Sequence, residues 1–600
     1  MPEQPRYRVV FTPSGLSGEL EAGLSVLDAA RQLGVDLDTV CGGRGICGRC
    51  QVVPAMGDHA KWAITAEADH VSPPGDLEVD YRGKRPLRDG HRLGCATQIL
   101  GDVVIDVPAE SQIHRQVVRK TVDVGDLVVD PLITLHYLAA DAAPADADAG
   151  VAARIGRQLG ADWDMPNVTV DPAALAGSDE PSGAGDLTVA VRERSRVVGA
   201  WPGYVDLVVG AAIDVGSTTI AGHLCDLSSG EVLASAGRMN PQIRFGEDLM
   251  SRVSYVMMNP GGDAELTAAV RTELRELLEE LLDAAGIDRS RLLDIVLVGN
   301  PIMHHIFLGL DPTPLGQAPF PLAISDAVDT RADEIGLDGR ASVYVAPCIA
   351  GHVGADTAAA ILSEGPHRGD AIQLLVDVGT NAEIVLGNRH RLFAASSPTG
   401  PAFEGAQISA GQRATAGAIE RVRIDRDTLE PRFKVIGSDL WSDEPGFADE
   451  TAATGVTGIC GSGIIEVMAE LFVAGVIDAQ GVISPSGIER TDRIVPVERT
   501  ASYLLHDDPE RPIHVTQADV RAIQLAKAAL RAGIELLLEH AELTAVDEIK
   551  LAGAFGAHID PVHAMILGLV PDCPVEQVRS VGNAAGSGAV RALLSAEQRR

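Results

Sequence analysis

Two apolar runs of the sequence end in almost the same turn, and this repetition constrains the fold more than any other feature. Val205–Ile213 leads into Asp214-Val-Gly-Ser-Thr-Thr219, and 163 residues later Ile372–Val376 leads into Asp377-Val-Gly-Thr-Asn381. Each run is typical of a buried strand, and the glycine after it lets the backbone turn so that amides and hydroxyls face phosphate oxygens. One such turn is a weak signal, since many strands end in this way. Two of them, in a chain of alternating strands and helices, predict duplicated lobes around a nucleotide cleft.

The two aspartates of these turns are the predicted catalytic residues. A carboxylate at the end of a strand can orient Mg²⁺ through its water ligands, or orient a water molecule for attack. Asp214 and Asp377 hold these positions. From the turns around them we predict nucleotide contacts by Gly216, Ser217, Thr218, Thr219, Gly379, Thr380 and Asn381.

Further glycine-rich turns extend the predicted nucleotide site. Gly458–Gly463 opens onto an apolar helix, and the short apolar strand Ile549–Leu551 is followed by Ala-Gly-Ala-Phe-Gly. Lys527 lies in a predicted helix over 517–530, where nucleotide contact and a surface ion pair fit the sequence equally well. Gly582–Ala589 is predicted to permit close helix packing between the lobes. A P-loop is excluded, because the chain has no G-x4-G-K-Ser/Thr motif. These turns and the helix add Gly461, Ser462, Gly553, Phe555, Gly556 and Lys527 to the predicted contacts.

Four of the eight cysteines lie in the first hundred residues and need a metal or redox explanation. Cys41, Cys47 and Cys50 fall within ten residues, with glycines between them, and Cys95 follows after a long gap. Glycine lets the backbone wrap closely around an inorganic cluster and present amide groups to its sulfides. The five-residue gap, followed by C-x2-C, resembles the vertebrate-type and related [2Fe–2S] ferredoxins. A structural zinc site is the alternative, but zinc usually takes paired C-x2-C knuckles, and only Cys47 and Cys50 form one.

The segments around these cysteines predict the rest of a small domain. Tyr7–Phe11 and Leu16–Glu21 alternate like the strands of a hairpin, and Ser25–Leu33 carries a helical apolar stripe. Gly101–Val107, just after Cys95, is predicted to close the sheet. This order of strand, strand, helix and cluster loop resembles the β-grasp ferredoxin fold.

Length and charge limit the remaining possibilities. Six hundred residues are too many for one ordinary core, and two segments, 139–150 and 177–185, have the composition of loops or linkers. The formal charge of −35 would repel phosphate backbones, so nucleic acid is not an expected partner. Because the sequence offers neither a signal peptide nor a run of about 18 apolar residues, we expect a cytoplasmic location without membrane contact.

Ten stretches between residues 205 and 600 carry a further resemblance. They are Asp214–Thr219, Asn240–Arg252, Val298–His305, Pro347–Asp356, Asp377–Glu383, Gly400–Gly405, Gly458–Gly463, Thr516–Ala529, Leu551–Gly556 and Val581–Ala589. In this order they resemble the reductive activators of corrinoid proteins, whose C-terminal region belongs to the acetate and sugar kinase–Hsp70–actin (ASKHA) superfamily. The N-terminal cysteines resemble those of the branch of this family that carries a [2Fe–2S] domain.

The resemblance implies a multidomain chain. Residues 1–110 would be the β-grasp [2Fe–2S] ferredoxin, 111–204 a linker with a small middle domain, and 205–600 an α/β actin- and Hsp70-like ATPase. The implied cofactors are a [2Fe–2S] cluster and ATP with Mg²⁺. The implied activity is the ATP-dependent return of a Co(II) corrinoid protein to Co(I), with the electron passing through the cluster.

The implied partners are a corrinoid protein of a methyltransferase or methionine synthase system and an external electron donor. Whether the chain forms a homodimer is left open by the sequence. Two alternatives also stay open. One is an ASKHA-type small-molecule kinase with a redox-sensing ferredoxin domain. No substrate-binding motif in the sequence supports this kinase alternative. The other is an ATP-dependent activator of a radical dehydratase or reductase, although such activators hold one [4Fe–4S] cluster between two small subunits.

Overall fold

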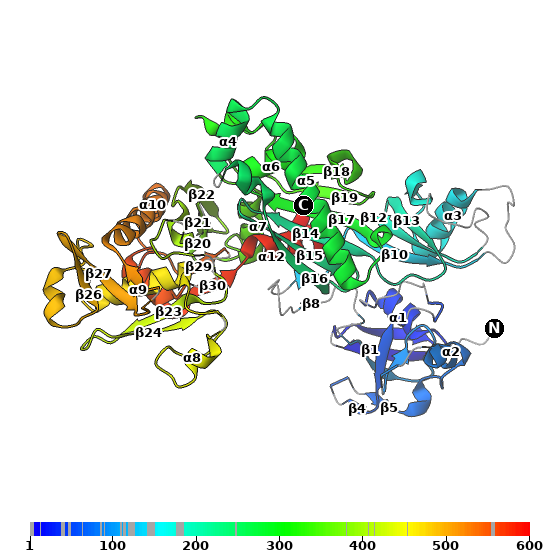
Figure 1. Cartoon of the computed structure of the whole chain (residues 1–600). Helices are drawn as coiled ribbons and strands as arrows, with labels where there is room; N and C mark the ends of the chain where they lie inside the picture. The colour runs from blue at the N-terminus through cyan, green and yellow to red at the C-terminus, as the bar shows by residue number, and fades with distance from the viewer. Residues whose placement is uncertain are drawn as a thin grey trace.

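The structure is a computed structural model of the whole chain. It describes residues 5–12, 14–35, 37, 43–45, 48, 50–59, 61–62, 64–84, 87–88, 90–108, 111, 116–117, 127–140, 150–175, 185–246, 249–379, 381–405, 407–412, 414–452, 454–509, 511–553 and 559–600. Successive units, each built around its own main sheet, follow one another from blue to red in Figure 1.

The N-terminal unit is a five-stranded sheet in the order β2-β1-β7-β3-β6. Its elements are β1 (Arg6–Thr12), β2 (Ser17–Glu21), α1 (Val26–Leu33), β3 (Gln51–Ala55), β4 (Gly57–His59), β5 (Ile64–Ala66), α2 (Asp76–Lys84), β6 (Arg92–Leu93) and β7 (Val103–Asp106). The predicted hairpin and helix are confirmed: β1 and β2 pair antiparallel, and the Ser25 hydroxyl caps α1 by accepting the Asp28 N–H. Strand β7 lies inside the sheet, parallel to β1 and antiparallel to β3, so it joins the two halves of the sheet.

An intermediate unit follows, with a four-stranded sheet in the order β10-β12-β13-β11. The elements of this part of the chain are β8 (Gln116–Val117), β9 (Leu127–Val128), β10 (Ile133–Leu138), α3 (Val151–Trp163), β11 (Thr169–Val170), β12 (Leu187–Arg192) and β13 (Arg196–Pro202). Arg44 joins it to the N-terminal unit, donating to the Tyr137 carbonyl at 3.1 Å and pairing with Asp162 at 3.0 Å. The predicted linkers 139–150 and 177–185 lie almost wholly outside the described residues.

The next unit, up to residue 369, is a six-stranded sheet with helices packed on it, in the order β16-β15-β14-β17-β19-β18. Its elements are β14 (Val209–Val215), β15 (Thr219–Asp226), β16 (Val232–Met239), α4 (Leu249–Met258), α5 (Gly262–Ala285), β17 (Leu292–Gly299), α6 (Pro301–Leu308), β18 (Val328–Arg331), β19 (Ser342–Val345) and α7 (Ala355–Glu364). Strands β15 and β16 extend the sheet antiparallel on one side of β14, and β17 and β19 extend it parallel on the other.

The last unit contains a sheet in the order β22-β21-β20-β29-β30, with two smaller sheets beside it. Its elements are β20 (Gln373–Val378), β21 (Ala382–Asn388), β22 (Arg391–Ser397), β23 (Ala418–Ile424), β24 (Pro431–Val435), α8 (Phe447–Glu450), β25 (Gly458–Ile459), α9 (Gly461–Val473), β26 (Ile494–Val497), β27 (Thr500–His506), β28 (Ile513–Val515), α10 (Gln517–Ala541), β29 (Glu548–Ala552), α11 (Pro561–Leu567), β30 (Val578–Gly582), α12 (Ala584–Leu594) and α13 (Ala596–Arg599). Here β21 and β22 extend the sheet antiparallel from β20, and β29 and β30 extend it parallel. The strand order of the preceding sheet around β14 therefore recurs around β20.

Helices α7 and α12 pack between the two sheets, as Figure 1 shows near the centre of the molecule. A β-carbon on Gly588 of α12 would lie 1.9 Å from the carbonyl oxygen of Ala359 in α7, so only glycine fits at this crossing. This confirms the close helix packing predicted from Gly582–Ala589. None of the helices in the described part of the chain has the length and apolar run that a bilayer crossing requires.

We expect Gly588→Ala to destabilise the protein, because the added methyl group has no space and the two helices must separate. Overpacking of this kind costs about 1–3 kcal/mol, which a lower midpoint of thermal unfolding would reveal. Gly156→Ala is the matched control, since nothing lies within 4 Å of the added carbon in α3. That change should be neutral or stabilise the helix by up to about 1 kcal/mol. Equal midpoints for the two variants would contradict the packing argument.

Candidate functional site

A cleft of about 540 Å³ lies where the repeated turns of the two sheets meet. Of the predicted nucleotide residues, those that line it are Asp214, Gly216, Ser217, Thr218, Thr219, Asp377, Gly379, Asn381, Gly461, Ser462 and Gly553. Thr380, Phe555 and Gly556 lie outside the described residues. Lys527 is half-buried on α10, beside Gly568 at the end of α11, and is not among the residues that line the cleft.

Glycine is required at two of the turns. A β-carbon on Gly216 would lie 2.5 Å from the Thr219 carbonyl oxygen. Gly553 has a positive φ of 95°, and its β-carbon would lie 2.6 Å from Oδ1 of Asp377. Side chains at these positions would displace the turns, so main chain rather than side chain approaches the cleft there.

Helix α9 begins at the cleft wall. Cys460 is its N-cap and makes no side-chain capping hydrogen bond, and Gly461 and Ser462 form its first turn. The first N–H groups of a helix have no acceptor within the helix, and the helix dipole adds partial positive charge at this end. The start of α9 is therefore suited to a phosphate group.

Four carboxyl groups face this one cleft; burial raises the pKa of all four, and repulsion adds to the rise for three of them. Burial raises the pKa of Asp214 to about 8, and repulsion from Asp356 and Asp377 adds to the rise. Burial likewise raises the pKa of Asp377 to about 7 and that of Asp356 to about 6. The pKa of Glu383 is raised well above its ordinary value by burial and then by repulsion from the aspartates. Without a cation, this cluster resists full ionisation.

Asp356 and Glu383 are site residues that the sequence patterns did not identify as such. Glu383 lies on β21 directly opposite Asp377 on β20, so the two side chains lie on the same face of the hairpin. The corresponding partner of Asp214 is Ala221, so the second turn carries an acid that the first lacks. The hairpin register was the signal that could have found Glu383. Asp356 lies in the first turn of α7, and only the packing of α7 brings it to the cleft.

The residues present fit a divalent cation bound together with an anionic ligand. No lysine, arginine or histidine lies among the described residues that line the cleft, so four carboxyl groups have no basic neighbour there. Asn300 and Asn583 add two amide side chains, and Asn583 hydrogen-bonds to Asp214. Oxygen ligands of this kind suit Mg²⁺, which usually keeps several waters and binds through one or two carboxylates and phosphate oxygens.

The cysteine segment is described in part. Cys41 and Cys47 lie outside the described residues, whereas Cys50 is buried and Cys95 is half-buried. Gln51 pairs with Leu93, and the Gly94 N–H donates to the Cys50 carbonyl at 2.7 Å, so Cys50 and Cys95 come together at one end of the β3–β6 pair. A β-carbon on Gly43, whose φ is 94°, would lie 3.7 Å from that of Cys95. Gly43, within the predicted ligand loop, thus lies against Cys95.

The acidic cluster predicts a stability that depends on pH and on Mg²⁺. The folded-state pKa values lie above the ordinary carboxyl value of about 4, so the protonated groups stabilise the fold below that pH. This stabilisation is lost as the pH rises through about 6 to 8. The melting temperature of the metal-free protein should fall over this window, and Mg²⁺ should raise it more at the alkaline end.

Asp356→Asn should flatten both dependences, because one repelling carboxylate is gone. Asp443→Asn, on an exposed loop, should leave them unchanged and serves as the control. A melting temperature of the wild type that responds to neither pH nor Mg²⁺ would rule out this description of the cluster.

Comparison with known proteins identifies relatives along the whole chain. A model described as the RACo middle region matches residues 209–369, and one described as the C-terminal ASKHA domain of RACo matches 371–600. The corrinoid activation enzyme RamQ of Eubacterium limosum is 31% identical over 596 residues, covering 96% of this chain and 90% of RamQ. A reductase of the Co(II) methylated amine-specific corrinoid protein from Methanosarcina barkeri is 26% identical over 380 residues, covering 60% of this chain and 66% of the reductase.

A solved structure of a reductive activator for a corrinoid, iron–sulfur protein superposes with a TM-score of 0.68 at 29% identity. The superposition covers 99% of this chain and 93% of that one. The boundary between the two matched models falls between the two sheets that share a strand order. Related to RamQ along nearly its whole length, the chain belongs to the RACo family of reductive activators of corrinoid proteins.

Proposed function

We propose that this protein is an ATP-dependent reductive activator, which returns the cobalt of a corrinoid protein from Co(II) to Co(I). The observation that carries the proposal is the alignment with a corrinoid activation enzyme over 96% of the chain. Corrinoid methyltransferases use Co(I) as a nucleophile and become inactive when it loses an electron. The partner is therefore a corrinoid protein of a methyltransferase or methionine synthase system, and an external donor supplies the electron.

In this proposal residues 1–110 are a β-grasp ferredoxin whose ligands are Cys41, Cys47, Cys50 and Cys95. The approach of Cys50 to Cys95 and the positive φ values of Gly43, Gly45 and Gly48 support it, because glycine at these three positions lets the backbone turn tightly and lie close to a bound group. When bound there, a [2Fe–2S] cluster supplies one-electron transfer. Arg44, between the first two ligands, holds this loop against the intermediate unit, which belongs to the proposed segment 111–204.

Residues 205–600 are, in this proposal, an ASKHA ATPase with two duplicated lobes. The recurring strand order supports the duplication, and the cleft between the sheets supports nucleotide binding. The glycine turns and the start of α9 would bind phosphate groups, and the carboxyl groups would hold Mg²⁺, which neutralises phosphate charge. Asp214 and Asp377 are the proposed catalytic residues, with Asp356 and Glu383 beside them. Asn583 orients Asp214 through its hydrogen bond.

ATP is needed because the electron transfer is uphill. Plant-type clusters have potentials of about −400 mV, and each additional 59 mV of deficit costs about tenfold in a one-electron equilibrium. A protein whose two lobes change their arrangement with the nucleotide state can favour one complex with the corrinoid protein and then release it. The four repelling carboxyl groups make that arrangement sensitive to the bound ligand.

The cysteine assignment predicts which residues hold iron. Cys50→Ser and Cys95→Ser should abolish or perturb the visible absorbance and the reduced-state paramagnetic signal of a [2Fe–2S] centre. Cys225→Ser, in β15, and Cys573→Ser, between α11 and β30, should leave both signals unchanged, because these thiols lie in other units. Stoichiometric zinc without iron in the anaerobically purified protein would contradict the assignment and support the zinc alternative.

The activity itself is tested with a Co(II) corrinoid protein and a reductant under anaerobic conditions. Formation of Co(I), followed by its absorbance, should require the cluster and hydrolysable ATP together. Asp214→Ala and Asp377→Ala should reduce ATP hydrolysis at least about 100-fold, the usual loss when a metal or transition-state contact is removed, and should stop cobalt reduction. Their iron content should stay intact, because the two sites lie in separate units.

Undiminished multiple turnover without nucleotide, with several candidate corrinoid proteins, would refute the activator function. Phosphorylation of a small metabolite in place of cobalt reduction would support the kinase alternative.

A further inference from the structure

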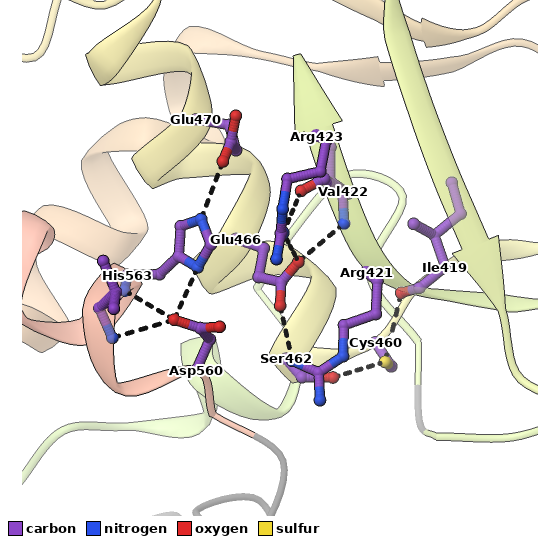
Figure 2. A network of polar contacts seen from close by, with 11 residues as sticks. Ile419, Arg421, Val422, Arg423, Cys460, Ser462, Glu466, Glu470, Asp560 and His563 are labelled. Carbon is purple, nitrogen blue, oxygen red and sulfur yellow. Dashed lines mark hydrogen bonds and ion pairs between the residues drawn. The ribbon is translucent and has the colours of Figure 1, made fainter. Parts of the chain in front are cut away.

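A second group of charged side chains lies behind the cleft, in the last unit. Figure 2 shows it between α9, α11 and β23. Helix α9 contributes Glu466 and Glu470, and the start of α11 contributes Asp560 and His563. Strand β23 contributes two arginines, Arg421 and Arg423. The proposed reaction uses none of these residues.

Glu466 is the arginine-bound end of the group. It is fully buried and pairs with Arg421 at 2.7 Å and with Arg423 at 2.6 Å. It also accepts the N–H of Val422 at 2.8 Å. A buried carboxylate with two guanidinium partners and one amide donor is well satisfied, so this end ties α9 to β23.

His563 is the link between the two helices. Its Nε2 lies 2.9 Å from Oε1 of Glu470, and its Nδ1 lies 3.0 Å from Oδ1 of Asp560. Burial alone would lower the pKa of His563, but the bonds to Asp560 and Glu470 raise it to about 9. The same contact holds the pKa of Asp560 far below its ordinary value. At neutral pH the ring is therefore an imidazolium with a carboxylate on each side: its Nε2 hydrogen-bonds to Glu470, and its Nδ1 forms an ion pair with Asp560.

A metal ion is the competing explanation, since ligand atoms of Glu466, Asp560 and His563 lie within 4.8 Å of one another. Charge decides against it. The three carboxylates of the group face three cations: Arg421, Arg423 and protonated His563. The group is neutral as it stands, and a bound cation would have to displace the His563 proton and sit beside two guanidinium groups.

The position of the network connects it to the cleft. The first residues of α9, Gly461 and Ser462, line the cleft, and Glu470 lies about two turns further along the same helix. Helix α11 follows β29 along the chain, and Gly553, directly after β29, also lines the cleft. The imidazolium thus joins the helix that begins at the proposed phosphate site to α11, the next described helix after the Gly553 turn.

We propose that His563 is a positioning residue for ATP, which holds the start of α9 at the correct distance from the β29 side of the cleft. The inference rests on the proposed ATP site. It assigns to His563 no contact with the nucleotide and no proton transfer. Loss of the imidazolium leaves the half-buried carboxylates of Glu470 and Asp560 without their shared cation, so α9 and α11 separate and the phosphate site loosens.

The test compares His563→Gln with His563→Arg in the full-length, iron-loaded protein, by steady-state ATP hydrolysis. His563→Gln should raise the KM for ATP about tenfold, which is less than the ~100-fold loss that a misplacement of 1 Å can cause. The same change should alter kcat by less than about twofold. His563→Arg should restore most of the wild-type KM, because a guanidinium can donate to both carboxylates. Glu470→Gln should act like His563→Gln from the other helix. His514→Gln, on β28 in the same unit, is the matched control and should change neither constant.

The pH profile separates positioning from simple stability. Since the raised pKa keeps His563 charged below about pH 8, the wild-type KM should be flat there and rise as the pH passes about 9. His563→Arg should stay flat across that range, because arginine does not lose its proton.

A wild-type KM in His563→Gln, or equal impairment in His563→Gln and His563→Arg, would overturn the inference. The inference would also be overturned if the wild-type protein held a stoichiometric metal other than iron and the His563→Gln variant lost it. Absence of ATP hydrolysis in the wild-type protein would instead refute the proposed function, so the two failures are distinguishable.

Discussion

The crossing of α7 and α12 is the contact on which the arrangement of the two cleft-forming sheets depends. At Gly588 the helices approach so closely that a single methyl group would collide with the Ala359 carbonyl. Helix α12 packs on β14 and β17, whereas α7 leads directly into β20. A crossing even slightly wider would therefore move one sheet away from the other. The cleft lies between two strand ends, one from each sheet, which the crossing holds close together.

The charges in the cleft make its arrangement sensitive to a bound cation. Asp214 comes from one sheet, Asp377 and Glu383 come from the other, and Asp356 comes from the helix between them. Burial raises their pKa values most, and repulsion across the junction of the two sheets adds to the rise. A cation bound with phosphate groups would turn that repulsion into attraction, because each carboxylate gains a common positive partner. A ligand that makes such a difference between two arrangements shifts the population between them.

The described contacts also connect the cleft to the cysteine segment. Helix α12 continues into α13, and Asp130 of the intermediate segment bonds to this junction: its N–H donates to the Leu594 carbonyl, and its own carbonyl accepts the Ala596 N–H. The intermediate sheet then receives Arg44 from the cysteine loop, through Tyr137 and Asp162. A continuous series of backbone hydrogen bonds and Arg44 contacts thus connects the α7–α12 crossing to the segment that carries the predicted cysteine ligands.

Much of the local structure of this protein could be predicted from the sequence alone. The two aspartate turns, the glycine turn at 458–463 and the hairpin and helix before Cys41 were all predictable, because strand ends, tight turns and caps depend on neighbouring residues. Asp356, Glu383 and the His563 network were not, because each depends on register or on how helices pack. Glu383 faces the cleft only since β21 pairs with β20 in one register, and Lys527, on a long helix with several possible faces, lies outside the cleft lining. The sequence by itself determined which segments carry glycine turns and carboxylates of the kind that suit phosphate and metal. Only the tertiary structure decided which charges share one cleft, because repulsion and burial act between residues that are distant along the chain.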